Sequence, residues 1–118
     1  MEKTRFAYIF IGGFFGSAIR EFLSLSFPGT WGTLLANISG SLILGYLMYA
    51  TNIGLFSERQ RYLVGFGFCG GLTTFSSFIV QTMQFSSTFA LLNITANIGL
   101  CLTCVFLGRT LTKKGLWA

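Results

Sequence analysis

The sequence predicts an all-α membrane protein with four transmembrane helices in a single domain, residues 1–118. Hydrophobic residues make up 53% of the chain and charged residues only 9%. Crossing a hydrocarbon core of about 30 Å takes about 20 apolar residues as a helix. Stretches of that length lie near residues 5–25, 30–51, 61–85 and 88–111. They leave little chain for a soluble domain, so we expect a multi-pass protein in the lipid bilayer.

The first stretch carries a face of small residues and ends near a cation. Gly12 and Gly16 form a G-x-x-x-G pair, and Gly13 and Ser17 repeat the spacing one residue on. Such spacings let membrane helices approach closely. Arg20 follows on the face of Gly16. Its side chain either extends toward the lipid headgroups or attracts anions to a pore entrance.

The second stretch carries a polar face. Thr33, Asn37 and Ser41 are spaced i, i+4 and i+8, so they lie on one side of a helix. An Asn amide in hydrocarbon costs free energy unless its hydrogen bonds are satisfied. This face must therefore meet another helix or water, as packing or as part of a site.

The third stretch contains a weak point at its centre. Gly70 and Gly71 are followed by Thr73 and Thr74, and both residue types disfavour a continuous helix, so we expect a break at mid-membrane. Non-helical backbone at that depth must be buried in protein or line a wet cavity. Carbonyl oxygens of the first half-helix would suit a cation, and amides of a second half starting near Thr74 would suit an anion. Alternatively, the glycines only allow close packing.

Aromatic and amide residues follow the weak point. Phe75 and Phe78 are spaced i and i+3, and the electropositive edge of a phenyl ring can contact an anion. In the fourth stretch Asn93 and Asn97 are spaced i and i+4. These residues add neutral polar groups and ring edges to the expected membrane interior.

The sequence lacks the groups that several function classes need. It has no His, and its carboxylates Glu2, Glu21 and Glu58 lie in or near expected loops and helix ends. A buried general acid or base is therefore missing, so we do not expect an enzyme. A small four-helix multidrug/proton antiporter needs a membrane-buried carboxylate, which disfavours that alternative. A non-transporting membrane assembly protein remains the other alternative.

The remaining groups favour passage of a small ion. Neutral hydrogen-bond donors, aromatic edges and interrupted backbone can replace the hydration shell of an ion. Cys101 and Cys104 form a C-x-x-C with no His or second pair beside it, and we interpret them as apolar filler. The net charge of +5 comes without the basic patch that nucleic-acid binding needs, so no nucleic-acid partner is expected.

Three motifs resemble those of the Fluc (CrcB) fluoride channels. Residues 70–78, Gly-Gly-Leu-Thr-Thr-Phe-Ser-Ser-Phe, look like the third-helix signature of that family. Residues 32–40 have its G-T-L-x-x-N-x-x-G form, and residues 12–20 are similar to its G-G-x-x-G-x-x-x-R. The resemblance covers nearly the whole chain. The chain departs from the family at Gln81, where a Glu is common, and at Asn93 and Asn97, near which a Tyr and a Ser are common.

The resemblance implies a passive, fluoride-selective channel that exports fluoride from the cytoplasm across the bacterial cell membrane. It also implies an antiparallel, dual-topology-type dimer with two fluoride pathways and a structural sodium ion at the interface. The implied roles are backbone carbonyls for sodium at Gly70 and Thr73, a fluoride pathway at Asn37, Phe75, Phe78, Ser76 and Thr33, and a vestibule position for Arg20.

The distribution of cations predicts one orientation in the membrane. Four spans put both termini and the loop 52–60 on one side, and cytoplasmic segments are the positive ones, so both termini are expected in the cytoplasm. If this chain inserts in one orientation and the working unit is antiparallel, its partner is expected to be a homologue of the opposite orientation, giving a heterodimer. Pairing of the chain with itself is the alternative. Apart from Arg20, all the cations fall on the side of the termini, at Lys3, Arg5, Arg59, Arg61, Arg109, Lys113 and Lys114.

Overall fold

The computed structural model describes residues 2–117, with side chains from residue 3 to residue 112. All regular elements in these residues are helical, and no strand occurs among them. Four helical spans are long and apolar enough to cross a membrane: Lys3–Ser26, Trp31–Asn52, Glu58–Gln84 and Ser87–Thr112. This confirms the all-α, four-span prediction. The elements in chain order are α1 (Glu2–Ser26), α2 (Trp31–Asn52), α3 (Glu58–Gln60), the π-helix η1 (Arg61–Cys69), α4 (Gly70–Leu72), α5 (Ser76–Gln84) and α6 (Ser87–Trp117).

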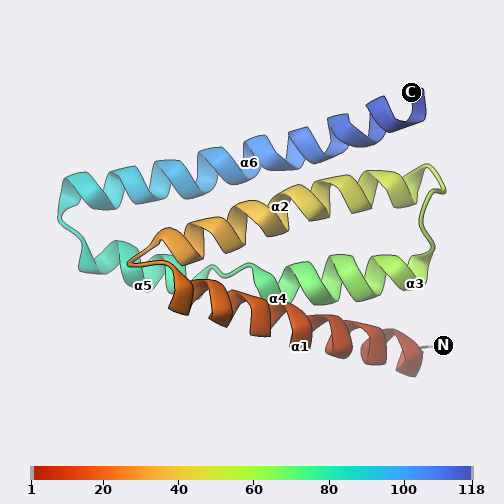
Figure 1. Cartoon of the computed structure of the whole chain (residues 1–118), viewed down its shortest axis with the longest axis horizontal. Helices are drawn as coiled ribbons and strands as arrows, with labels where there is room; N and C mark the ends of the chain where they lie inside the picture. The colour runs from red at the N-terminus through yellow and green to blue at the C-terminus, as the bar shows by residue number, and fades with distance from the viewer. Residues whose placement is uncertain (1, 118) are drawn as a thin grey trace.

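The spans lie roughly side by side in an elongated bundle of 46 × 35 × 22 Å. Figure 1 shows that the start of α1, the end of α6 and the turn between α2 and α3 lie at one end of the bundle. The turns that join α1 to α2 and α5 to α6 lie at the other end (Figure 1). α1 packs along η1 and α4, while α2 packs along α6. The interrupted third span therefore lies beside both α1 and α2.

The small-residue face of α1 packs against the third span. A Cβ atom added at Gly12 would overlap the backbone carbonyl of Leu63, and one at Gly16 would overlap that of Phe68. The two helices therefore approach so closely that only glycine fits at these positions. This contact bears out the packing role predicted for the G-x-x-x-G pair.

The third span differs from the sequence prediction in two ways. Its first half contains the π-helix η1, which has wider i→i+5 turns. No pattern in the sequence predicted these turns. Gly70 and Gly71 are helical rather than the site of the break, since Gly70 has φ −63° and ψ −39°. A Cβ at Gly71 would lie 2.5 Å from the carbonyl oxygen of Gly13. Gly71 thus serves close packing against α1, and the helix is interrupted after Leu72 instead.

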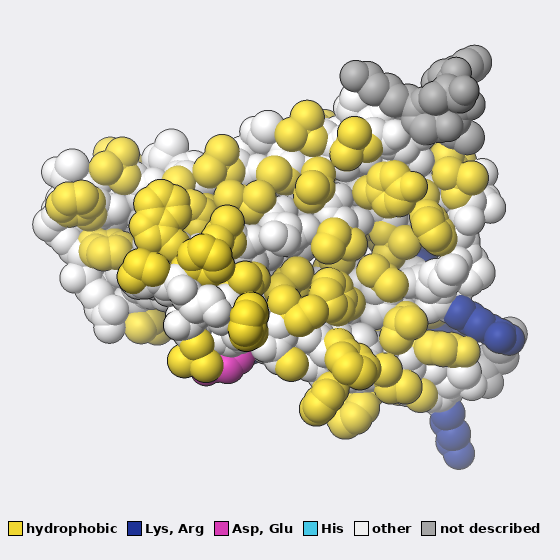
Figure 2. Space-filling view, viewed as in Figure 1, with side chains coloured by type: hydrophobic (Ala, Val, Ile, Leu, Met, Phe, Trp, Pro, Cys, Tyr) yellow, Lys and Arg dark blue, Asp and Glu magenta, His cyan; other side chains and the backbone are white. Residues whose placement is uncertain are grey.

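The outer surface of the bundle is largely apolar. Figure 2 shows hydrophobic side chains spread over most of the visible face, with Lys and Arg gathered at one end. Large exposed apolar side chains line both outer helices, among them Phe6, Phe10, Phe14 and Phe22 on α1 and Phe89, Leu91, Leu102 and Phe106 on α6. Lipid is the environment that such a surface fits, because a soluble monomer rarely exposes apolar patches of this extent. The structure thus has the surface of a multi-pass membrane protein.

Candidate functional site

Residues 73–75 interrupt the third span. Thr73 is extended, with φ −80° and ψ 153°, and Phe75 returns to helical angles just before α5. The backbone amide and the hydroxyl of Thr73 both donate to the carbonyl oxygen of Cys69, at 2.9 and 2.8 Å. The amide of Ser77 donates to the hydroxyl oxygen of Thr74 at 3.2 Å, which caps the first turn of α5. Threonine side chains thus satisfy helix ends on both sides of the interruption.

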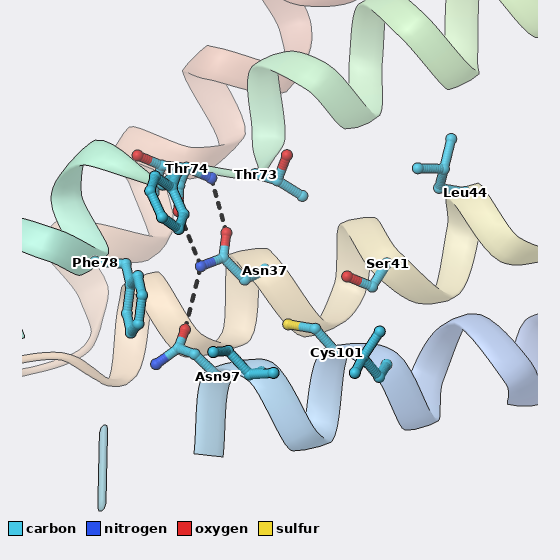
Figure 3. A pocket seen from close by; sticks show the side chains of 11 residues that line it. Asn37, Ser41, Leu44, Thr73, Thr74, Phe78, Asn97 and Cys101 are labelled. Atoms are coloured by element: carbon cyan, nitrogen blue, oxygen red, sulfur yellow. Dashed lines mark hydrogen bonds between the residues drawn. The ribbon is translucent and has the colours of Figure 1, made fainter. Parts of the chain in front are cut away.

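Asn37 of α2 supplies the hydrogen bonds that the interrupted helix lacks. The amide of Thr74 donates to Asn37 Oδ1 at 2.7 Å, and Asn37 Nδ2 donates back to the Thr74 carbonyl oxygen at 3.1 Å. This reciprocal pair is drawn in Figure 3. A carboxamide carries one acceptor and two donors, like a peptide group with an extra N–H. Asn37, only 8% exposed, therefore substitutes for two helical partners of Thr74.

The second N–H of Asn37 enters a chain of hydrogen bonds along α6. Asn37 Nδ2 donates to Asn97 Oδ1 at 3.2 Å, as drawn in Figure 3. Asn97 Nδ2 donates to the carbonyl and side-chain oxygens of Asn93, at 2.9 and 3.1 Å. Asn93 Nδ2 donates to the hydroxyl oxygen of Thr82 at 2.9 Å, which donates to the carbonyl of Phe78 at 2.7 Å. This amide relay connects the interruption to α5 through α6.

A cavity of about 400 Å³ lies beside the interruption, between α2, α5 and α6. Its polar groups come from Asn37, Thr73, Thr74 and Asn97, together with Ser41. Figure 3 shows Asn37, Asn97, Ser41 and Cys101 in the space between the helices. No charged side chain lines it among the described residues. The remaining lining residues are apolar: Leu44, Phe75, Phe78, Ile98, Cys101 and Leu102.

Two phenyl rings stand at the wall of the cavity. The ring centroids of Phe75 and Phe78 lie 5.7 Å apart with an interplanar angle of 50°. Phe78 is 5% exposed, whereas Phe75 is 73% exposed. One ring thus belongs to the interior of the bundle, and the other projects from the chain. Together with the exposed lining residues Ile98 and Leu102, this ring is positioned to contact a second molecule or lipid.

The structure brings together four of the eight residues to which the family resemblance gave a role. Asn37, Thr73, Phe75 and Phe78 line this cavity. The other four do not line it. Thr33 is buried, Ser76 is exposed with its hydroxyl 3.4 Å from that of Thr74, Gly70 is exposed on α4, and Arg20 is half-buried on α1.

The family resemblance assigned no role to two residues that matter at the site, and sequence reasoning expected the amides near Thr74 to face an anion. Asn97, 5% exposed, bonds directly to Asn37, and Thr74 provides the backbone groups that Asn37 binds. The i, i+4 spacing of Asn93 and Asn97 indicated a buried polar face, but not which helix that face would meet. A partner 60 positions away along the chain has no signature in the local pattern.

The fold and the cavity define a small multi-pass membrane protein that carries a neutral polar site at an interrupted helix. Comparison with known proteins identifies the family. The model of the family described as "CrcB-like protein, Camphor Resistance (CrcB)" matches residues 7–109. The chain therefore belongs to the CrcB-like family, as the three sequence motifs indicated.

Similar proteins of this family cover nearly the whole chain. The chain is 43% identical over 113 residues to the fluoride-specific ion channel FluC 2 of Methanosarcina acetivorans, covering 95% of this chain and 90% of the relative. It is 40% identical over 109 residues to the FluC channel of Methanocaldococcus jannaschii, covering 86% and 88%. It is 39% identical over an alignment of 127 residues to the FluC channel of Koribacter versatilis, covering 97% and 99%.

Proposed function

We propose that this chain forms a passive, fluoride-selective ion channel that exports fluoride from the cytoplasm. The observation that carries the proposal is the neutral cavity at the interrupted helix, where the Asn37 amide and the rings of Phe75 and Phe78 meet. Amide N–H groups and ring edges attract an anion without a fixed positive charge that would hold it. The names of the similar proteins, fluoride-specific ion channels, supply the identity of the ion.

The proposed fluoride pathway begins from this cavity. Asn37 donates to the ion, and Phe75 and Phe78 present their edges to it. Thr33 of α2 and Ser76 of α5 add hydroxyl groups to this pathway outside the cavity itself. Arg20 lies on α1 toward the bundle end opposite the termini, where a cation raises the local concentration of anions at a vestibule.

We further propose that the working unit is an antiparallel dimer with the interruption at mid-membrane. Phe75 supports this arrangement, because 73% of its surface is exposed although it borders the cavity. A second chain laid against α5 would cover this ring and complete the wall. The numbered names FluC 1 and FluC 2 among the relatives also fit pairing between two homologous chains, so the partner is this chain itself or an oppositely oriented homologue.

A structural sodium ion at the dimer interface fits the backbone near the interruption. Among the described residues, no backbone amide donates to the carbonyl oxygens of Gly70 or Thr73. Uncharged carbonyl oxygens suit a hard monovalent cation, and half-helix ends with negative dipoles coordinate sodium in other membrane proteins. Gly70 and Thr73 would hold the ion together with the same groups of the second chain, and its charge would bind the two interruptions to one another.

The charge distribution supports a single orientation with both termini in the cytoplasm. Figure 1 places the start of α1, the end of α6 and the α2–α3 turn at one end, and the sequence places all cations except Arg20 there. Labelling of tags at each terminus in intact cells measures this orientation. Termini found inside and outside in comparable numbers would contradict it and would favour pairing of the chain with itself. A bacterial cell membrane as the location stays a prediction.

Fluoride efflux from liposomes tests the channel function. The chain is reconstituted alone in one preparation. In a second preparation it is reconstituted together with a homologue whose cations lie on the opposite side of the membrane. Chloride is the control ion in both. We expect fluoride flux far above chloride flux, and loss of that flux in Phe75→Ile and Phe78→Ile with the dimer intact. Phe66→Ile is the matched control, because Phe66 is an exposed ring on the same span away from the cavity. Absence of flux from both reconstitutions would refute the channel and favour a membrane assembly protein.

A multidrug/proton antiporter is less compatible with the structure. Among residues 3–112, whose side chains are described, no carboxylate lines the cavity, and Glu21 and Glu58 are exposed. Proton exchange needs a titratable group that substrate and proton share. Flux that depends on a proton gradient in the liposome assay would instead favour this alternative.

A further inference from the structure

The amide relay gives Asn97 a part in anion binding that no family motif assigns. Both N–H groups of Asn37 are already used, one by the Thr74 carbonyl and the other by Asn97 Oδ1. An anion in the cavity can receive a hydrogen bond from Asn37 only by displacing one of these acceptors. This inference rests on the proposed function, because it concerns an anion that binds at Asn37.

The two acceptors differ in how easily they are displaced. The Thr74 carbonyl belongs to a reciprocal pair whose other bond is 2.7 Å long, so breaking it would also loosen the interruption. The bond to Asn97 is the longest of the three at Asn37, 3.2 Å, and no second bond between the same residues reinforces it. Asn97 faces the cavity, so the released N–H group would point toward the space that the ion enters.

Asn97 can give up this bond without losing its place. Its Nδ2 atom keeps two acceptors on Asn93, and Asn37 keeps both bonds to Thr74. An N–H group bound to an anion makes a charge-assisted hydrogen bond, which is roughly twice as strong as a neutral one. A small anion with concentrated charge is therefore able to replace the Asn97 oxygen, and a larger anion with diffuse charge replaces it less well.

We propose that Asn97 is a positioning residue that tunes anion affinity, because its carboxamide oxygen occupies the second Asn37 donor until an anion displaces it. Binding then includes the free energy of breaking the Asn37–Asn97 bond. This cost is the same for every anion, so Asn97 lowers the affinity of the site without changing its preference among the halides. Asn97 acts through Asn37 and holds its place by its own contact to Asn93.

The test compares two substitutions on α6. Asn97→Leu removes the competing acceptor, whereas Thr103→Val removes an exposed hydroxyl that donates to the Gly99 carbonyl of its own helix and does not line the cavity. We expect Asn97→Leu to lower the half-saturating fluoride concentration about fivefold, the size of one neutral hydrogen bond. Thr103→Val should leave it near the wild-type value. Equal changes in the two variants, or no change in Asn97→Leu, would overturn the proposal.

A second measurement separates this proposal from the channel function. Asparagine occurs only at positions 37, 52, 93 and 97, so ¹⁵N-labelled asparagine gives few side-chain amide signals. The Asn37 signal should shift on addition of sodium fluoride, and at lower concentration in Asn97→Leu, or in Asn97→Ala if the leucine variant does not fold. Wild-type liposomes without flux would refute the channel. The role of Asn97 would be refuted by an Asn37 signal that does not shift with fluoride. It would also be refuted by a shift that occurs at the same fluoride concentration with and without Asn97.

Discussion

Replacing Asn37 by leucine tests whether this side chain holds the interruption in place. Leucine has a similar volume but neither donor nor acceptor, so Asn37→Leu removes three hydrogen bonds while leaving little space behind. Two of these bonds satisfy the backbone of Thr74, at 2.7 and 3.1 Å, and the third satisfies Asn97. The substitution therefore isolates polar support from packing.

The structure gives the size of the expected loss. A buried polar group left without its partner costs about 1–3 kcal/mol, and Asn37→Leu leaves two such groups on Thr74. The sum is about 2–6 kcal/mol, and water in the adjacent cavity would reduce it by reaching the freed groups. Hydrogen bonds measured inside a membrane protein average about 0.6 kcal/mol. We therefore expect a loss near the lower end, about 2 kcal/mol in the free energy of unfolding.

Unfolding in mixed micelles and amide hydrogen exchange measure the effect. Detergent-induced unfolding gives the change in stability, and the exchange rate of the Thr74 amide reports directly on its bond to Asn37. Ser39→Ala is the matched control on the same helix, because the Ser39 hydroxyl donates at 2.7 Å only to Leu35 of its own helix. We expect this control to change stability by less than about 1 kcal/mol.

Two results would refute this reasoning. The first is a stability of Asn37→Leu within about 0.5 kcal/mol of the wild type, the range of ordinary surface substitutions. The second is an unchanged exchange rate of the Thr74 amide. Either would mean that the interruption is fixed by the threonines and the surrounding packing, with Asn37 as a passive neighbour.

Two further predictions concern helix packing and the amide relay. Gly16→Ala should lower the free energy of unfolding by about 1–3 kcal/mol, because its Cβ would overlap the backbone of Phe68. Gly99→Ala is the control, because a Cβ at Gly99 would have no atom within 4 Å. Equal unfolding midpoints for the two variants would contradict the close contact. Thr82→Val should cost about 1 kcal/mol by removing the acceptor of the Asn93 amide and the donor to Phe78. Thr95→Val is its control, since the exposed Thr95 hydroxyl bonds only to Leu91 of its own helix, and a larger loss in the control would contradict a stabilising role for the relay.

Much of the fold could be predicted from the sequence, because hydrocarbon imposes simple requirements. Each span needs about 20 apolar residues with internally satisfied backbone, and the four stretches were found within a few residues of their limits. The spacing of Gly12 and Gly16 also identified a contact face. Here the residue type decides the outcome, because a Cβ at either position would overlap backbone of the neighbouring helix.

The interruption was predicted for the right region and partly for the wrong reason. Glycine weakens an isolated helix in water, but Gly71 lies against Gly13, and this close contact favours a helix there. The chain instead leaves the helix at Thr73, where the side chain and the amide share one acceptor. Helix propensity alone could not show this, because the deciding contacts come from α1 and α2.

The hydrogen-bond partners of the polar residues also could not be predicted from the sequence. Spacing showed that Asn37 and Asn97 each lie on a polar face of a helix. Their contact depends on how α2 and α6 are rotated about their axes, and periodicity within one helix does not determine that rotation. The same holds for the π-helix η1, whose wider turns leave no hydrophobic period of their own in nine residues.

The reciprocal pair at Thr74 has a consequence for how the site responds to change. The hydrogen bonds that replace the missing helical backbone bonds of Thr74 come from Asn37 of α2. The position of the interruption is therefore set by α2 rather than by the residues on either side of it. α2 packs along α6, and the relay from Asn37 through Asn97 joins the same two helices. A displacement of α6 against α2 would therefore move Asn97 relative to Asn37 while leaving the Thr74 pair intact. The longest bond of the network is thus the one most exposed to motion between helices, and it is also the bond that an entering anion has to replace.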